Sequence, residues 1–174
     1  MSQIKTVIRY SRRKTVGLRI KDGILTVSAP IGTKREYIDE VLKKHKSWIE
    51  RASQRDEKRA SLTKDLSPKD IKELKIRAKE YLTPLCENYA RLLGVSYKKI
   101  SINSARGRFG SCSSLGNIHF SYRIMLYPEA AREYVCLHEV CHLIEMNHSE
   151  RFYRLIEKIM PDYKKRRLLL KDPK

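Results

Sequence analysis

The segment His138-Glu139-Val140-Cys141-His142 constrains the fold of this chain more than any other feature. Each helical residue turns by about 100°, so His138 and His142 would lie about 40° apart and one turn along the axis, close enough to share a tetrahedral metal ion. Glu139 would project from the side of that pair without occupying a ligand position. The motif therefore predicts a helix that presents two imidazoles together and a carboxylate beside them.

His148, six residues beyond the motif, is the natural third ligand. A catalytic zinc ion usually takes three protein ligands and keeps a fourth position open. In a continuing helix, position 148 would lie about 240° around the axis and about 9 Å along it from His142, pointing away from the ion. We therefore expect the helix to stop at Met146-Asn147, because asparagine tolerates the left-handed conformation that ends helices.

This arrangement is typical of a zinc-dependent hydrolase. Zinc brings the pKa of a bound water near neutrality, and a neighbouring carboxylate can accept the proton as the water attacks a carbonyl. The predicted site has three zinc ligands, His138, His142 and His148, and one catalytic residue, Glu139, as the general base. We expect peptide bonds to be cleaved, with strand 117–122 as an edge along which an extended peptide pairs.

Other residues near the motif have competing interpretations. Cys136 and Cys141 could bind zinc, although small buried thiols on a core-facing helix are more common. Glu145 could support an imidazole or be a surface carboxylate, and it stands where a metzincin has glycine. His148 itself could be merely the residue before a helix cap at Ser149.

Two further residues are weaker candidates for the site. His119 and Tyr122 fall in the strand expected above the metal, where either could stabilise an oxyanion. Half-buried strand residues are the more common explanation for both. His45 is expected at the surface.

The chain has 174 residues, which suits one compact domain or a core with a small appendage. Its four cysteines are too irregularly spaced for a disulfide framework, which favours a reducing cytoplasm. The N-terminus lacks the apolar run of a signal peptide, and no stretch of about 18 consecutive apolar residues occurs. We expect a cytoplasmic protein without a membrane partner.

The net charge of +18 is unevenly distributed along the chain. Residues 1–60 carry 16 basic and 7 acidic side chains, and 151–174 carry 9 and 3, whereas 102–150 carry 4 and 5. Such basic flanks would attract nucleic acid or another polyanion, although solvated helix faces explain the charge equally well. Two alternatives to a peptidase therefore stay open: a nucleic-acid-associated metal-binding protein, and a non-peptide amidase that uses the same zinc site.

The N-terminal region alternates apolar and polar residues around Asp22-Gly23, a dipeptide typical of tight β-hairpins. We expect hairpin strands over 16–20 and 24–28. Another strand is expected over 6–10.

A helix should follow, started by a capping box at Thr33–Glu36. The almost wholly polar stretch 50–64 predicts a mobile connection. Residues 1–60 are thus expected to form an N-terminal extension of a β-hairpin and a helix.

The catalytic core is expected over residues 65–174, as an α+β fold in which an antiparallel sheet accompanies the active-site helix. Its expected elements are a helix from Ser67-Pro68 to Gly94, strands 99–103 and 117–122, a helix from Pro128 that carries the motif, a helix from Ser149 to Pro161, and a last helix or basic tail over 163–171.

A family resemblance rests on six segments between Arg106 and Tyr163: Arg108–Ser114, Gly116–Ile118, Tyr122-Arg123, His138–His142, Asn147–Ser149 and Phe152-Tyr153. In these segments the sequence resembles the YgjP-like metallopeptidases, a family of intracellular zincin-type proteins. The resemblance implies a zincin-like core, bound Zn²⁺, and a peptide or protein substrate. It also implies the same zinc ligands and catalytic base as the motif does. The family has tryptophan where Phe109 and Tyr153 stand, and Asn-Trp where Ser121-Tyr122 stands, so an aromatic ring is kept in each case.

Overall fold

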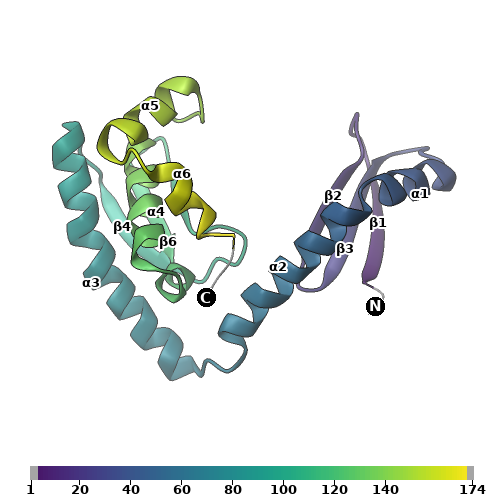
Figure 1. Ribbon diagram of the computed structural model, residues 1–174, viewed down its shortest axis with the longest axis horizontal. Coiled ribbons are helices and arrows are strands. Elements are labelled where there is room, and N and C mark those ends of the chain that lie inside the picture. Colours follow the sequence, from purple (N-terminus) through teal and green to yellow (C-terminus); the bar gives the residue numbers. More distant parts are fainter. Residues whose placement is uncertain (1–3, 172–174) are drawn as a thin grey trace. The chain divides into compact units, whose positions relative to one another are not determined.

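The computed structural model describes residues 4–171, and the chain splits into two compact units between Lys64 and Asp65 (Figure 1). The N-terminal unit holds a three-stranded sheet in the order β1-β3-β2 and two helices. Its elements are β1 (Lys5–Ser11), β2 (Gly17–Lys21), β3 (Ile24–Pro30), α1 (Arg35–Lys44) and α2 (Lys46–Lys64).

The predicted hairpin is confirmed. β2 and β3 pair antiparallel, and Asp22 and Gly23 between them both have positive φ, 52° and 73°, as the favoured two-residue hairpin turns require. The N–H of Gly23 also donates to a carboxylate oxygen of Asp56 in α2, at 2.8 Å. β1 confirms the further strand and pairs parallel with β3. The small core of this unit is formed by Leu25, Val27 and Ala29 of β3 together with Ile38 of α1.

Two N-terminal predictions are wrong. The capping box at Thr33–Glu36 does not form: Lys34 is the N-cap of α1 without a side-chain bond, and the Thr33 hydroxyl donates to the carbonyl of Pro30 at 2.7 Å. The stretch 50–64 continues α2 instead of forming a loop. None of the α2 residues is buried, so its polar composition reflects a solvated helix.

Over residues 65–171 the C-terminal unit contains three strands, a 3-10 helix and four α-helices, of which α3 is the longest. They are α3 (Pro68–Leu93), β4 (Lys99–Asn103), β5 (Gly110–Cys112), β6 (Asn117–Ser121), a 3-10 helix η1 (Tyr122–Leu126), α4 (Glu129–Cys141), α5 (Glu150–Ile159) and α6 (Tyr163–Leu168). As predicted, α3 begins at Ser67, which exchanges capping bonds with Asp70, and ends at Gly94 with φ 66°. Helix α3 contacts α4, and α4 in turn contacts β5, α5 and α6 (Figure 1).

The α+β class is confirmed, but the core sheet is mixed. Its order is β4-β6-β5. The two strands expected from the sequence, β4 and β6, pair parallel rather than antiparallel, and β5 pairs antiparallel with β6. Because β6 is flanked on both sides, the expected free edge at strand 117–122 is wrong. The short β5, which the sequence did not reveal, is the edge strand on the antiparallel side.

No helix of the described chain is both long enough and apolar enough to cross a bilayer. Cys86, Cys112, Cys136 and Cys141 are free thiols.

Candidate metal centre

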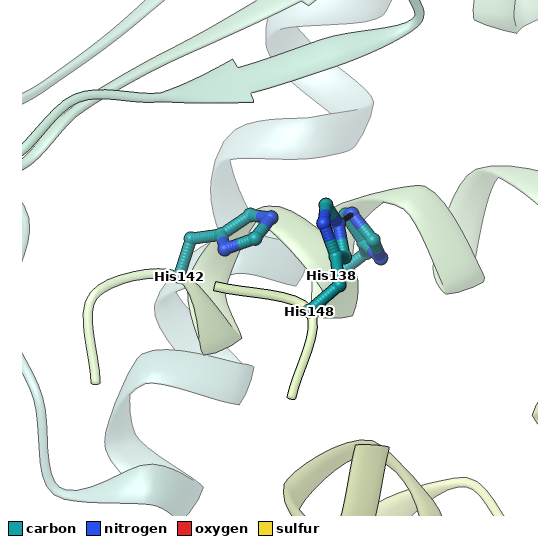
Figure 2. A group of neighbouring side chains, drawn as sticks. All are labelled: His138, His142 and His148. Atoms are coloured by element: carbon teal, nitrogen blue, oxygen red, sulfur yellow. Dashed lines mark hydrogen bonds between the residues drawn. The ribbon is translucent and has the colours of Figure 1, made fainter. Parts of the chain in front are cut away.

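The structure brings His138, His142 and His148 together (Figure 2). One ring nitrogen from each lies within 4.8 Å of the others. His138 comes from α4, His142 is the residue that caps it, and His148 comes from the segment before α5. His142 is buried, His138 is half-buried and His148 is exposed, so the cluster lies at the surface with one side open.

The active-site helix stops before His148, as the third-ligand hypothesis requires. It stops earlier than predicted, however: α4 ends at Cys141, whose carbonyl accepts hydrogen bonds from the N–H groups of Ile144 and Glu145 at 3.1 and 3.0 Å. Asn147 is not the terminator, because Asp22 is the non-glycine residue with positive φ within residues 4–171. The turn at residues 142–144 and the following irregular segment therefore bring His148 back towards the helix without a left-handed residue.

The hydrogen bonds of the histidines favour metal binding by Nε2. Nδ1 of His142 lies 3.0 Å from the carbonyl oxygen of Glu145, which can only accept, so Nδ1 carries the proton and Nε2 keeps a lone pair. The Nε2 atoms of His138 and His148 are 3.0 Å apart. Two nitrogens bound to one tetrahedral zinc ion at about 2.0–2.1 Å would be about 3.3 Å apart. Three imidazoles in this arrangement fit such an ion.

Burial keeps the ligand pair in the neutral form that binds metal. It lowers the pKa of His138 to about 3, with smaller contributions from His142 and His148, and it also lowers the pKa of His142. At neutral pH these two rings are therefore uncharged and their lone pairs are available.

Phe152 packs beneath the whole cluster. This fully buried residue of α5 has its ring centroid 4.9 Å from that of His138, 4.5 Å from that of His142 and 4.9 Å from that of His148. Ser149 caps α5 as predicted, with its hydroxyl accepting from the N–H of Phe152 at 3.3 Å. The sequence did not predict the contact of Phe152 with the three rings; Phe152 was named only as one of the residues that carry the family resemblance.

The side chain of Glu139 extends from α4 to the edge strand β5. This side chain is buried, which raises its pKa to about 8, while the nearby positive charge of Arg108 opposes that rise. A β-carbon placed on Gly110 would be only 2.5 Å from Oε1 of Glu139, so the backbone of β5 passes directly against the carboxylate. The sequence did not predict that Arg108 and Gly110 lie beside Glu139, although both belong to the segment Arg108–Ser114 that carries the family resemblance.

The competing candidates on α4 have structural explanations. Cys136 and Cys141 are buried, as expected, and neither belongs to the metal-binding group. Cys136 directs its thiol towards the carbonyl of Leu82, and burial raises the pKa of Cys141 to about 12, so that thiol stays protonated. Glu145 does support an imidazole, but through its backbone oxygen rather than its carboxylate.

His119 lies on the wrong face of the sheet for an oxyanion stabiliser. Gly110 faces Glu139 and pairs with Phe120, so His119, the next residue along β6, faces the opposite way. Its Nδ1 is 2.5 Å from the hydroxyl of Ser101 on β4. Tyr122 is fully buried beneath the guanidinium of Arg123. His119 is thus a half-buried residue within β6, and Tyr122 begins η1 instead of belonging to the strand, whereas His45 is exposed as predicted.

Residues 58–173, about two thirds of the chain, match the family model described as YgjP-like, metallopeptidase domain. Among solved structures, the metallopeptidase zymogen of Pyrococcus abyssi abylysin is similar, with 24% sequence identity and a TM-score of 0.45. That similarity covers 49% of this chain and 87% of the other. No curated protein matches.

Proposed function

This chain belongs to the YgjP-like metallopeptidase family, and we propose that it hydrolyses peptide bonds with zinc held by His138, His142 and His148. The observation that carries the proposal is the approach of the Nε2 atoms of His138 and His148 to 3.0 Å while His142 is oriented by a backbone carbonyl. When bound there, zinc supplies a Lewis acid that polarises a carbonyl and acidifies water.

In this proposal Glu139 is the general base. Its carboxylate accepts a proton from the attacking water and transfers it to the leaving amine nitrogen. Burial, which raises the pKa of Glu139, makes the carboxylate a better proton acceptor, and Arg108 limits the effect. The backbone at Gly110 packs directly against the Glu139 carboxylate, and this contact restrains the position of the carboxylate.

The edge strand β5 is the proposed docking site for the substrate, in place of the strand 117–122 expected from the sequence. β5 pairs on one side with β6, and its Gly110 lies against Glu139. An extended peptide could pair with the other side of β5 through main-chain hydrogen bonds. Because such bonds do not depend on the side chains, peptides of many different sequences could bind there. Peptides or proteins are therefore the proposed substrates.

The test compares Glu139→Gln with the wild type. We expect the variant to keep its metal content and circular dichroism spectrum while hydrolysis of a peptide library falls by about 10²–10⁴-fold, the usual contribution of a general base. Glu145→Gln is the matched control, since Glu145 contacts the site through its backbone oxygen, and it should retain activity. Equal activity in Glu139→Gln and wild type would refute the proposal.

The amidase alternative has its own outcome in the same experiment. Cleavage of simple amides that requires Glu139, without cleavage of any library peptide, would favour it. The cytoplasmic location and the polyanion partner stay predictions from composition. A groove in the N-terminal unit favours the polyanion partner.

A further inference from the structure

A groove of about 660 Å³ opens in the N-terminal unit, and none of its lining residues takes part in the proposed catalysis. Its lining residues come from the connection between β1 and β2, the end of β3, and helix α1 with its flanking residues. Val16, Pro30 and Val41 line it as half-buried apolar residues, and Val16 also packs on the core of this unit. The groove thus has an apolar floor supported by the core.

Lysines surround this floor. Lys14 comes from the β1–β2 connection, Lys34 from the start of α1 and Lys44 from its end, and all three are exposed. None of them forms an ion pair or side-chain hydrogen bond with another residue of the described chain. Glu40 is the single carboxylate in the lining. Three cations without partners around one concave surface favour a ligand with several negative charges.

Tyr37 adds an aromatic surface to the same groove. It lies on α1 between the two helix lysines, and 55% of it is exposed although it is a large apolar ring. Nucleobases stack on such rings, with about 1–3 kcal/mol per base, while lysines follow the phosphates. A double helix keeps its bases stacked internally, and a bilayer surface would not enter a concave groove.

We propose that this groove binds single-stranded nucleic acid, with a base on Tyr37 and phosphates at Lys14, Lys34 and Lys44. Nothing in this step depends on the metal centre. The same chemistry serves RNA and single-stranded DNA, which differ in the 2′-hydroxyl.

The experiment measures fluorescence anisotropy of labelled oligo(rU) and oligo(dT), each about 12 nucleotides long, on the full chain. Affinity is recorded between about 50 and 200 mM salt, because each neutralised phosphate adds about 0.7 to the slope of log affinity against log salt. We expect Lys14→Gln/Lys34→Gln/Lys44→Gln to reduce that slope by about 2 and to weaken binding at least about tenfold.

The matched control is Lys5→Gln/Lys43→Gln/Lys46→Gln, which removes the same charge from exposed lysines of this unit outside the groove lining. An equal loss in both triple variants would overturn the proposal in favour of general charge attraction. Undetectable or salt-independent binding by the wild type would also overturn it.

Tyr37→Leu tests the stacking contact. Binding should weaken about tenfold or more with the salt slope unchanged, whereas Tyr10→Leu, at a tyrosine 50% exposed on β1, should have little effect. Equal binding of heparin, or of vesicles rich in anionic lipid, with no effect of Tyr37→Leu would overturn the assignment to nucleic acid. Glu139→Gln should bind the oligonucleotides as the wild type does, whether or not the chain proves to be a peptidase.

Discussion

Gly110 of β5 lies directly against Glu139 of α4: a β-carbon at position 110 would be 2.5 Å from Oε1 of the carboxylate. Any other residue there would force either the strand or the carboxylate to move. The contact therefore joins the edge strand to the proposed general base, and it accounts for a glycine in a strand position where no positive φ requires one.

Gly110→Ala should displace Glu139 without disturbing the histidines. A misplacement of about 1 Å can cost about 10²-fold in rate, so we expect a fall of that order in kcat/KM with zinc affinity retained. The measurement is peptide hydrolysis alongside metal titration. Gly17→Ala is the control, because its new methyl would meet only the flexible end of the Arg13 side chain. Unchanged hydrolysis by Gly110→Ala would contradict the role given to this contact.

Much of the candidate site could be predicted because its information is local. The four-residue spacing of His138 and His142 makes them neighbours in any helix, and the need to turn His148 back follows from helical geometry. The exact helix end could not be predicted, since it depends on hydrogen bonds to the Cys141 carbonyl rather than on a residue type such as Asn147.

Local sequence patterns could not predict the contacts between segments that lie far apart in the chain. Gly110 and Phe152 approach the motif only through tertiary packing, so neither carries a local signal of its role. The alternation of apolar and polar residues also could not reveal that β4 pairs parallel with β6. Side chains alternate with the same period of two in parallel and antiparallel strands. That is why the expected edge at 117–122 proved to be the centre of the sheet.

Phe152 should position the three imidazoles. Phe152→Ala removes a fully buried ring and is expected to lower the free energy of unfolding by about 3–5 kcal/mol, and also to weaken zinc binding. Ile156→Ala, one turn along α5 and equally buried, should lower stability by about 2–5 kcal/mol with zinc affinity near the wild-type value. Zinc titration and chemical unfolding separate the effects. Equal zinc affinity in both variants would show that Phe152 serves the core alone.

The pH dependence of the metal-free protein should reveal the buried carboxylate. Burial raises the pKa of Glu139 from its ordinary 4.5 to about 8, so the folded state binds this proton more tightly than the unfolded state. Its contribution to stability is therefore fully present below about pH 4.5 and is lost as the pH rises through about 8.

Thermal unfolding with a chelator present, across this pH range, tests that expectation in the wild type and Glu139→Gln. The lowered pKa of His138 affects both proteins alike and cancels in the difference. The stability of the wild type relative to the variant should decline with rising pH. A difference that stays constant from about pH 4.5 to about 8 would contradict a buried, proton-binding Glu139.

The most direct test of the account is zinc binding by wild type and His148→Ala. The wild type should bind one zinc ion per chain, and loss of the third imidazole should weaken binding by more than about 100-fold, beyond the usual cost of losing a residue that only supports a ligand. His45→Ala, at an exposed histidine of the N-terminal unit, should bind zinc as the wild type does. Full zinc affinity in His148→Ala would contradict the three-histidine site.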